Sequence, residues 1–549
     1  MTTVDQQPEH ATAPALDFDA IVIGAGFGGL YALHKLRALG YRARVIEMGD
    51  GVGGTWYWNR YPGARCDVES IEYSFSFDPR LEQEWTWTEL MPPQPEIERY
   101  LNFVADRLEL RPDIQFETKV TAMTWDEQRC FWTVETDRGD RYTAQFVVAA
   151  TGCLSAPLTP DIPGMDTFAG TTLYTNSFPK EGFDFSGKRV AVVGTGSSGV
   201  QSIPVVAQQA GHLYVFQRSA AYTRPANNRL LAPGELDELK RAYPEMRRAQ
   251  RQTATGVIRF GGALMAGDPP TRKILETGPE ERMRLVDELG WAAPSAWADV
   301  MVDMAANRAA TELYAELIRR EVKDPAVAES LIPHYPMGCK RQIIDTSYFA
   351  TFNRDNVSLV DLRRDSIVEI TATGIRTERD DFELDVILFA TGFDAMTGAL
   401  NRIDIRGRDG ASLREFWESE GAQTYLGLQV AGFPNLFTVT GPLSPSVAAN
   451  MVLGIEQHVE WIADCLGYLR DHGYRSVEAT PEAQDGWVDH ANSLVDGSIR
   501  TSEACNSWYV GANVPGKKRV YMVYAGGLAN YRAKCAEIAG AGYEGFRLA

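Results

Sequence analysis

The sequence predicts an α/β protein with two Rossmann-like dinucleotide-binding domains and a helical insertion in the second of them. It contains two Gly-x-Gly-x-x-Gly turns, at residues 24–29 and 194–199, and each follows an apolar strand and opens a helix. Such glycines allow a tight turn and close backbone approach, and the N–H groups at the start of the helix attract a pyrophosphate. The third observation is a charged stretch of helical character over residues 227–332. We therefore expect one protein that binds two different dinucleotides.

The first unit predicts a site for an adenosine without a 2′-phosphate. An apolar strand over residues 20–23 precedes the turn, and a helix follows in which leucines recur every three residues from Leu30 to Leu39. The next strand, over residues 44–47, ends in Glu47. A carboxylate at this place accepts hydrogen bonds from ribose hydroxyls, as FAD or NAD requires.

The second unit predicts NADPH in preference to NADH. Its first strand covers residues 189–193, and its second strand, over residues 213–216, is followed by Gln217, Arg218 and Ser219. Arg218 therefore occupies the position that Glu47 holds in the first unit. A guanidinium binds a 2′-phosphate with paired hydrogen bonds, whereas a carboxylate would repel it.

Size and charge restrict the class of protein. The chain has 549 residues, enough for two or three domains, and its net charge of -19 opposes binding to nucleic acid or to an anionic membrane. It has no apolar run long enough to span a bilayer. Its first 19 residues contain no Lys or Arg and no apolar core, so they predict neither a signal peptide nor an anchor.

The seven cysteines are dispersed, and they form neither a Cys-x-x-Cys pair nor a zinc-binding spacing. We therefore expect no metal site and no flavin disulfide reductase, since those reductases need a close cysteine pair. An odd, dispersed number of cysteines suits a reducing compartment, and we expect a cytoplasmic protein that is a monomer or a weak homo-oligomer.

A loop rich in aromatic residues, over residues 53–67, is the second informative feature. Its Trp, Tyr and Gly residues form a suitable wall for a planar cofactor, although a packed loop that only supports the first unit would look similar. The loop resembles the motif of type I Baeyer–Villiger monooxygenases: Gly-Gly-x-Trp, four residues, Tyr-Pro-Gly, three residues and Asp. Every defined position matches. Residues 340–341, 390–394, 441–446 and 507–516 are also similar to that family, so the resemblance covers nearly the whole chain.

The resemblance implies an enzyme that uses FAD, NADPH and O₂ to convert a ketone into an ester or lactone, through a flavin peroxide and a tetrahedral adduct. One alternative is a flavin monooxygenase that oxidises sulfur or nitrogen, since it shares both nucleotide sites. Another, of a different class, is a non-catalytic flavoprotein that senses NADPH.

The resemblance also implies roles for individual residues. Arg341 would be the cation that stabilises the peroxide and the alkoxide, and Asp67 would orient it, although loop aspartates more often cap helices or turns. Lys340 would join Arg218 and Ser219 at the 2′-phosphate, and Trp508 would cover the nicotinamide. The ketone pocket would be lined by Ser446, Val447, Ala448 and Met451. The full set expected to bind cofactors comprises Gly24, Gly26, Phe27, Gly29, Glu47, Gly54, Thr55, Trp56, Arg65, Asp67, Tyr73, Val120, Thr195, Gly196, Ser197, Ser198, Gln201, Arg218, Ser219, Lys340, Arg341 and Trp508.

One segment departs from the family's pattern Phe-x-Gly-x-x-x-His-x-x-x-Trp-Pro. Here Tyr174 stands in place of the histidine and Phe178 in place of the tryptophan. Tyrosine still offers a hydrogen-bonding group, whereas phenylalanine keeps the ring and loses the indole N–H. Either the coupling between domains and the reaction preference are altered, or both residues only pack.

The expected domain boundaries follow from the two nucleotide units and the helical stretch. Matching strand ends, Ala-Thr-Gly at residues 150–152 and 390–392, are expected to return the chain between domains. The FAD-binding domain is expected to comprise residues 1–153 and 395–549, which also supply the substrate and coenzyme loops. The NADPH-binding domain is expected at residues 154–226 and 336–394, with the insertion at residues 227–335.

Overall fold

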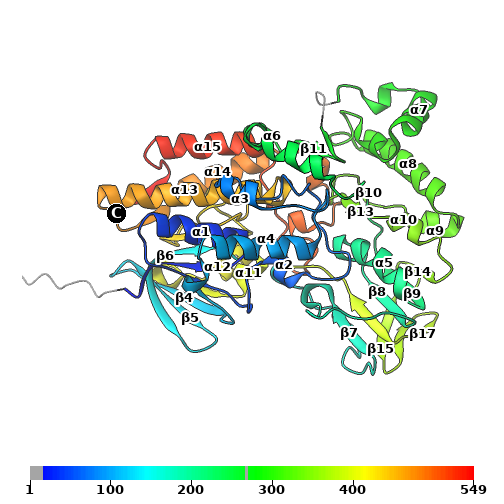
Figure 1. Cartoon of the computed structure of the whole chain (residues 1–549), viewed down its shortest axis with the longest axis horizontal. Coiled ribbons are helices and arrows are strands. Elements are labelled where there is room, and N and C mark those ends of the chain that lie inside the picture. The colour runs from blue at the N-terminus through cyan, green and yellow to red at the C-terminus, as the bar shows by residue number, and fades with distance from the viewer. Residues whose placement is uncertain (1–15, 266–269) are drawn as a thin grey trace, which may run out of the picture.

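The computed structural model describes residues 16–265 and 270–549 (Figure 1). Of the first 19 residues, which predict no signal peptide, residues 1–15 lie outside this range. The amino-terminal half is built on an eight-stranded mixed sheet of order β19-β4-β5-β6-β1-β2-β3, with β20 paired to β6. Its strands are β1 Phe18–Ile23, β2 Ala43–Ile46, β3 Ile114–Gln115, β4 Val120–Asp126, β5 Phe131–Thr136, β6 Arg141–Ala149, β19 Asp404–Arg406 and β20 Leu436–Thr438.

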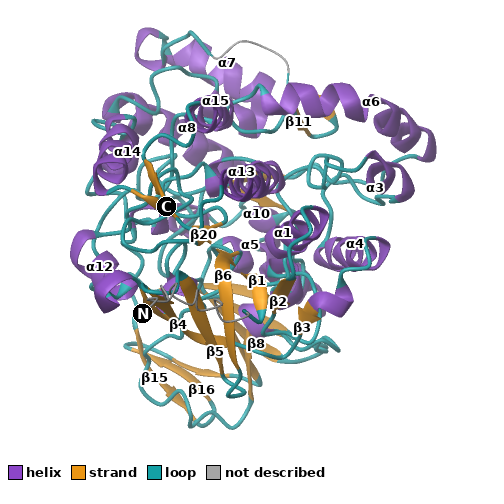
Figure 2. Cartoon of the chain, turned by 90° about the vertical axis from the view of Figure 1, so that its left-hand side faces the viewer, coloured by secondary structure: helices purple, strands orange, loops and turns teal. Residues whose placement is uncertain are grey.

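The central strands β3, β2, β1 and β6 run parallel, and β4 and β5 extend the sheet in antiparallel fashion. Helices α1 (Phe27–Ala38), α4 (Gln94–Arg107) and α13 (Met451–His472) lie on one face of this sheet (Figure 2). Leu30 and Leu33 of α1 and Leu466 of α13 are buried in one apolar core there. Because α13 comes from the end of the chain, the first domain is completed by carboxyl-terminal residues.

The second sheet is five-stranded and wholly parallel, of order β14-β9-β8-β18-β7. Its strands are β7 Thr171–Tyr174, β8 Arg189–Val193, β9 His212–Gln217, β14 Val357–Asp361 and β18 Val386–Phe389. Helices α5 (Ser197–Gln209) and α10 (Tyr348–Thr351) pack on it, and an antiparallel meander follows, with β15 Ile367–Thr371, β16 Gly374–Thr377 and β17 Asp381–Glu383.

The insertion contacts both halves of the protein. It comprises α6 Pro233–Arg251, the hairpin β11 Arg259–Phe260 and β12 Ala263–Leu264, and helices α7 Pro279–Leu289, α8 Met304–Glu321 and α9 Pro325–Ser330. Tyr314 and Ile318 of α8 belong to the core beneath the second sheet. Tyr243 of α6 instead belongs to the core of the first domain, and Arg247 donates to Glu82 there at 2.7 Å. The insertion therefore packs on the first domain as well as on the second.

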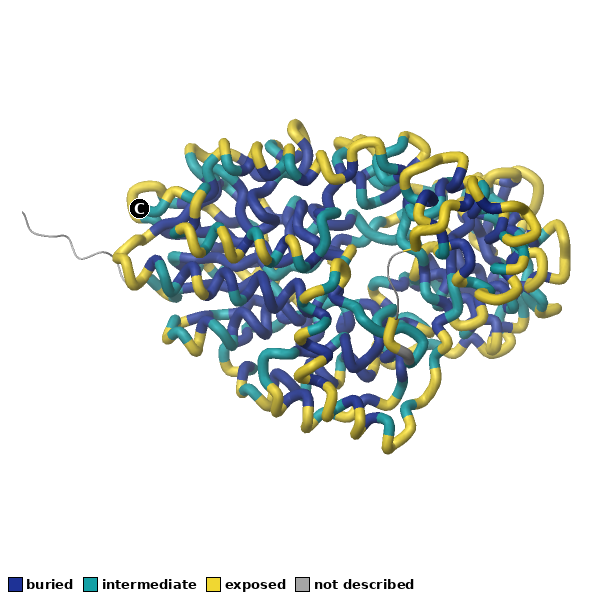
Figure 3. The backbone as a smooth tube through the Cα atoms, turned by 90° about the horizontal axis from the view of Figure 1, so that it is seen from above, coloured by how far each residue is buried: buried dark blue, intermediate teal, exposed yellow. Residues whose placement is uncertain are grey.

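The remaining helices and strands complete the chain. They are α2 Thr55–Trp58, α3 Pro79–Glu84, β10 Thr223–Pro225, β13 Ile343–Asp345, α11 Gly398–Asn401, α12 Leu413–Glu420, β21 Val477–Ala479, α14 Pro481–Ser493, α15 Leu528–Gly540 and β22 Phe546–Leu548. Buried backbone forms the interior of both halves, and exposed residues follow the outer helices and loops (Figure 3). No helix in the described part of the chain is long and apolar enough to cross a membrane.

Tyr174 and Phe178, which depart from the family's pattern, lie within the second domain. Tyr174 is the last residue of β7, and its ring stacks on Phe389 of β18 with 5.4 Å between ring centroids. Phe178 is buried and stacks on Phe185 at 6.4 Å. The contacts of both residues are therefore those of packing.

Candidate active site

The first glycine turn has the shape of a phosphate-binding turn. Gly24 has a φ of +99°, and a Cβ atom there would lie 2.7 Å from the carbonyl oxygen of Ala150. A Cβ atom at Gly29 would lie 1.7 Å from the oxygen of Gly24. Helix α1 begins directly after Gly26 without a side-chain cap, so its first N–H groups point toward a ligand's position.

The second turn repeats this arrangement. Gly194 has a φ of +111°, and a Cβ atom there would lie 2.5 Å from the carbonyl oxygen of Ala390. Helix α5 likewise begins after Gly196 without a side-chain cap. Ala150 and Ala390 open the two Ala-Thr-Gly segments, so each segment packs against the glycine turn of its own domain. The sequence analysis expected these segments only to connect the domains.

Glu47 lies directly beyond β2, at the edge of the first turn. Its Oε2 accepts from the N–H of Ala25 at 2.6 Å and its Oε1 accepts from the N–H of Gly49 at 2.7 Å. The side chain is buried, and burial raises its pKa. These two bonds fix the carboxylate beside the turn, and each oxygen keeps a further lone pair for a ribose hydroxyl.

One cavity brings together most of the residues expected to bind FAD. The aromatic loop supplies part of its wall, where Trp56 Nε1 donates to the hydroxyl of Tyr73 at 3.2 Å. Gly29 lies beneath the turn, and Asp67 and Arg65 lie outside the lining. The expected residues that do line this cavity are Gly24, Gly26, Phe27, Glu47, Gly54, Thr55, Trp56, Tyr73, Val120 and Met451. The glycine cradle, the carboxylate and the aromatic wall fit FAD.

The aromatic loop also touches the second domain. Gly63 has a φ of +81°, and a Cβ atom there would lie 2.3 Å from the carbonyl oxygen of Gln201 in α5. Gln201 accepts from the hydroxyl of Tyr61 at 2.8 Å and donates to the carbonyl of Arg65 at 3.0 Å. The Arg65 guanidinium itself donates to Glu89 at 2.6 Å. The hydrogen bond from the Gln201 side chain to the Arg65 carbonyl therefore links the aromatic loop of the first domain to helix α5 of the second.

Two cations lie near each other at the expected 2′-phosphate site. Arg218 and Ser219 follow β9 and are exposed, and Thr195 Oγ1 donates to the carbonyl of Ser219 at 2.8 Å. Burial, and then the charge of Arg218, lower the pKa of Lys340. Among the described residues neither cation forms a salt bridge with an acid. Ser197 and Ser198 begin α5 beside the turn. Two neighbouring cations without acidic partners fit a phosphate dianion, and so NADPH.

Arg341 and Asp67 meet although 273 residues separate them in the sequence. Arg341 Nε donates to Asp67 Oδ2 at 2.7 Å, and Nη2 lies 2.6 Å from the same oxygen. Nη1 donates to the carbonyl of Val447 at 2.6 Å. The Asp67 carboxylate is the main cause that raises the pKa of Arg341. The guanidinium is thus held charged and oriented, and 35% of its side-chain surface remains accessible.

The four residues expected to line the ketone pocket are neighbours. Ser446, Val447 and Ala448 form one turn of 3₁₀ helix, and Met451 begins α13. Ser446 Oγ lies 4.0 Å from the sulfur of Met451. Ser446 and Val447 are buried and Ala448 is exposed. The carbonyl of Val447 connects this turn directly to Arg341.

The structure adds residues that sequence analysis missed. Tyr509 lies beside Arg341, which acts to lower its pKa, whereas burial, the larger effect, raises it. The ring of Trp508 lies 4.3 Å from that of Tyr509. On β10, Arg224 stacks on Phe260, with 3.6 Å from its guanidinium carbon to the ring centroid. Burial lowers the pKa of Arg224, and the charge of Asp67 opposes that change. No spacing in the sequence indicates these contacts.

A disulfide joins Cys339 and Cys505, with 5.4 Å between the Cα atoms. The dispersed spacing had favoured reduced cysteines throughout, and this expectation is wrong for these two. Sequence separation misleads here because the fold brings residues 166 positions apart into contact. The other five cysteines are free thiols.

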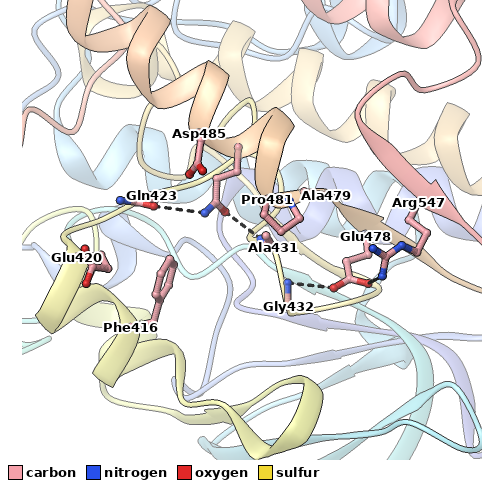
Figure 4. A pocket seen from close by; sticks show the side chains of 11 residues that line it. Phe416, Glu420, Gln423, Ala431, Gly432, Glu478, Ala479, Pro481, Asp485 and Arg547 are labelled. Carbon is pink, nitrogen blue, oxygen red and sulfur yellow. Dashed lines mark hydrogen bonds and ion pairs between the residues drawn. The ribbon is translucent and has the colours of Figure 1, made fainter.

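A separate cavity of about 520 Å³ lies between α12, α14 and β21. Figure 4 shows that Glu478 in its lining accepts from the backbone N–H of Gly432, at 3.0 Å. Gln484 likewise accepts from the backbone N–H of Ala431, at 2.9 Å. Arg547 lies 3.9 Å from Glu478. This cavity contains none of the expected site residues, so it is not the active site.

Two dinucleotide sites, an aromatic wall and a guanidinium between them define a flavoprotein oxidoreductase. Residues 21–258 match the family described as pyridine nucleotide-disulphide oxidoreductase. The chain is 42% identical over 538 residues to the acetone monooxygenase (methyl acetate-forming) of Gordonia sp. (strain TY-5), covering 96% of this chain and 99% of that protein. The chain belongs to the Baeyer–Villiger monooxygenases.

Comparison with solved structures supports the same family assignment. Steroid monooxygenase bound to NADP is 47% identical, with a TM-score of 0.90 over 97% of this chain and 99% of that one. OTEMO in complex with FAD and NADP is 39% identical, with a TM-score of 0.90 over 97% of this chain and 100% of that one. Cyclohexanone monooxygenase gives a TM-score of 0.91 in its closed structure (41% identity) and 0.87 in its open structure (40%); each comparison covers 97% of this chain and 99% of the other.

The expected family, fold class, cofactors and reaction are therefore confirmed. The protein is an FAD-dependent oxidoreductase that uses NADPH and O₂ to convert ketones into esters or lactones. Neither alternative, oxidation of sulfur or nitrogen or a non-catalytic sensor, is favoured by the comparisons.

Proposed function

We propose that Arg341 stabilises the negative charge that develops on oxygen when a ketone is oxygenated, and that Asp67 positions it. The observation that carries this proposal is the pair of contacts, 2.7 and 2.6 Å long, that bind the guanidinium to Asp67. Together with the bond to Val447 they use only some of the N–H groups of Arg341. The remaining N–H groups are free to donate to a developing oxyanion, so the stabilising charge would be in place before the reaction.

FAD, when bound, supplies the redox chemistry that carries one oxygen atom from O₂ to the ketone. The chain contributes the binding site and the electrostatic environment. The first glycine turn and Glu47 hold the nucleotide, and Trp56 and Tyr73 form the wall of the cavity. Exclusion of water from this cavity by the bound cofactors would favour oxygen transfer over loss of hydrogen peroxide.

Arg218, Lys340 and Ser219 are proposed to hold the 2′-phosphate of NADPH, and Trp508 to cover its nicotinamide. The support is the unpaired pair of cations and the position of Trp508 next to Tyr509, which neighbours Arg341. Ser446, Val447, Ala448 and Met451 are proposed to line the ketone pocket, because their turn is bonded to Arg341.

The division into an FAD-binding domain (residues 1–153 and 395–549) and an NADPH-binding domain (154–226 and 336–394) remains a proposal, supported by the two separate sheets. The insertion at residues 227–335 bridges them. A cytoplasmic location and a monomer or weak homo-oligomer also remain predictions.

Substitution Arg341→Ala tests the proposed role. We expect bound FAD and oxidation of NADPH to persist, while ester formation falls by about 10² to 10³, the usual loss for one preorganised donor. Absorbance of the flavin, NADPH consumption and chromatography of the product give the three readouts. Arg376→Ala is a matched control, because Arg376 pairs with Glu369 on the outer meander. Full ketone oxygenation by the Arg341 variant would remove the assigned role.

A competition experiment addresses the reaction preference. A ketone and an organic sulfide are supplied together, and the ester and the sulfoxide are measured. We expect the ester as the main product. A product mixture dominated by sulfoxide would favour the heteroatom-oxidising alternative.

A further inference from the structure

The Cys339–Cys505 disulfide lies at the junction of two segments of the active site. Cys339 directly precedes Lys340 and Arg341. Cys505 lies in a turn just before Trp508 and Tyr509. The disulfide therefore joins the segment that directly precedes β13 to a segment in the carboxyl-terminal part of the chain. Both cysteines are fully buried in the docked arrangement, so reagents reach them only when the segment around Cys505 opens locally.

The segment around Cys505 has little regular structure and is held by a small set of bonds. Arg519 donates to the carbonyls of Ser502 at 2.6 Å and of Cys505 at 2.9 Å, which closes the turn upon itself. Asn513 donates to the carbonyl of Phe393 at 2.8 Å. Turns with little regular structure and few backbone bonds open at low free-energy cost. A covalent bond to Cys339 would prevent that opening next to Arg341.

The docked arrangement also agrees with the comparison between the closed and open structures of cyclohexanone monooxygenase. The chain gives a higher TM-score with the closed structure of cyclohexanone monooxygenase, 0.91, than with the open one, 0.87. The two sulfurs can meet only when the two segments are docked, since disulfide formation needs Cα atoms within about 7 Å. The bond therefore traps the docked state and does not form in an open one.

We propose that Cys339 and Cys505 are a redox modification site whose oxidation holds Trp508 and Tyr509 against Lys340 and Arg341 and so slows the exchange of coenzyme. The proposal depends on the proposed place of Trp508 at the coenzyme site. Proteins of a reducing compartment use disulfides mainly as transient, redox-sensing bonds. This bond differs from a permanent brace because Trp508, in its proposed role over the nicotinamide, must move when coenzyme enters or leaves.

The oxidant we name is hydrogen peroxide, which an NADPH-driven flavoprotein monooxygenase releases when oxygen is not transferred to a ketone. Two thiols lose two protons and two electrons as the S–S bond forms, and hydrogen peroxide is reduced to two molecules of water. When a local fluctuation exposes the bond, a small dithiol reverses the reaction: it reduces Cys339 and Cys505 to thiols and is itself oxidised to a disulfide. Hydrogen peroxide that escapes would thus slow the exchange of coenzyme. Slower exchange in turn opposes further loss of peroxide.

The test uses the FAD-loaded full chain and needs no ketone. Thiols are counted under denaturing conditions before and after treatment with hydrogen peroxide or a dithiol, and release of NADP⁺ is followed by stopped-flow fluorescence. The reduced chain has seven thiols and the oxidised chain five. We expect release to be slower from the oxidised chain by a factor on the order of ten, because the cross-link blocks local opening of the segment that carries Trp508.

Cys339→Ser and Cys505→Ser should each release NADP⁺ at the rate of the reduced parent, whatever the redox treatment. Cys130→Ser, which removes a free and partly exposed thiol, is the matched control and should behave as the parent. The dithiol-treated parent provides the same comparison should a serine variant fail to fold. Seven thiols after peroxide treatment, or equal release from the oxidised and reduced parent, would overturn the proposal. Because no readout depends on ester formation, these outcomes are separate from failure of the proposed roles in ketone oxygenation.

Discussion

Replacement of Asp67 by Asn tests whether orientation of Arg341 matters apart from its charge. Asparagine keeps the size of the side chain and one acceptor oxygen, and it removes the negative charge that raises the pKa of Arg341. Asp67 makes two contacts with the guanidinium, at 2.7 and 2.6 Å. The variant therefore keeps Arg341 and weakens only the interaction between residue 67 and the guanidinium.

The expected size of the effect follows from these contacts. A hydrogen bond to a charged group contributes about 1.5 to 3 kcal/mol when buried. The two side chains are 35% and 28% exposed, so solvent screens part of this energy. We therefore expect a loss on the order of 2 kcal/mol, which is roughly a 30-fold decrease in the rate of ester formation.

The assay separates the two half-reactions. Reduction of FAD by NADPH is measured without oxygen, and ester formation is measured in air with a ketone. We expect flavin reduction to stay within about twofold of the parent, because Asp67 is absent from the lining of the FAD cavity. Asp404→Asn is the control, since Asp404 pairs with Arg406 on an outer strand. Ester formation unchanged by Asp67→Asn, or an equal loss in both half-reactions, would refute the assigned positioning.

Three further outcomes are expected. Arg218→Ala should narrow the preference for NADPH over NADH without changing the product, as kcat/KM for both coenzymes would report; equal kinetics with both coenzymes in the parent would contradict this. Because burial and Arg218 lower the pKa of Lys340, the KM for NADPH should rise as the pH increases toward that pKa, and it should rise later in Arg218→Ala; identical pH profiles would argue against the coupling. Burial raises the pKa of Glu72 from 4.5 to about 7. The protonated carboxyl group therefore favours folding below pH 4.5, and this contribution to stability is lost as the pH rises through 7. Glu72→Gln should therefore increase stability above pH 7 by up to about 3 kcal/mol, measured by denaturant titration, with the exposed Glu117→Gln as a control.

The sequence predicted the parts of the fold that rest on local pattern. Each glycine turn lies between a strand and a helix that follow one another in the chain, so Gly24, Gly194, Glu47 and Arg218 could be placed from spacing alone. The reason is that the βαβ unit is contiguous. The helical insertion was predicted from the composition of a contiguous stretch, whereas the order of the second sheet was not, because β18 pairs with β8 from almost 200 residues away in the sequence.

Contacts between distant segments could not be derived in this way. Arg341 and Asp67 were paired by resemblance to a family, and no periodicity connects them. Arg224 and Tyr509 reach the same region from β10 and from a carboxyl-terminal turn, and a sequence pattern does not encode that approach. The bond between Cys339 and Cys505 is the clearest case, because it depends on how the last 50 residues dock on the second domain.

Helix α6 shows a further limit. Its charged composition predicts a helix, but not which surface it covers. Tyr243 packs on the first domain and Arg247 pairs with the buried Glu82. Both contacts are tertiary, so the sequence could predict the helix itself but not the surface on which it packs.

The most direct test of the central claim is the fate of isotopically labelled oxygen in the parent and in Arg341→Ala. The FAD-loaded chain is mixed with NADPH, labelled O₂ and a ketone, and the products are analysed by mass spectrometry. The account predicts an ester that carries one labelled oxygen atom in the parent, and labelled hydrogen peroxide in its place in the variant. Labelled peroxide alone from the parent, or labelled ester from both proteins in equal yield, would contradict it.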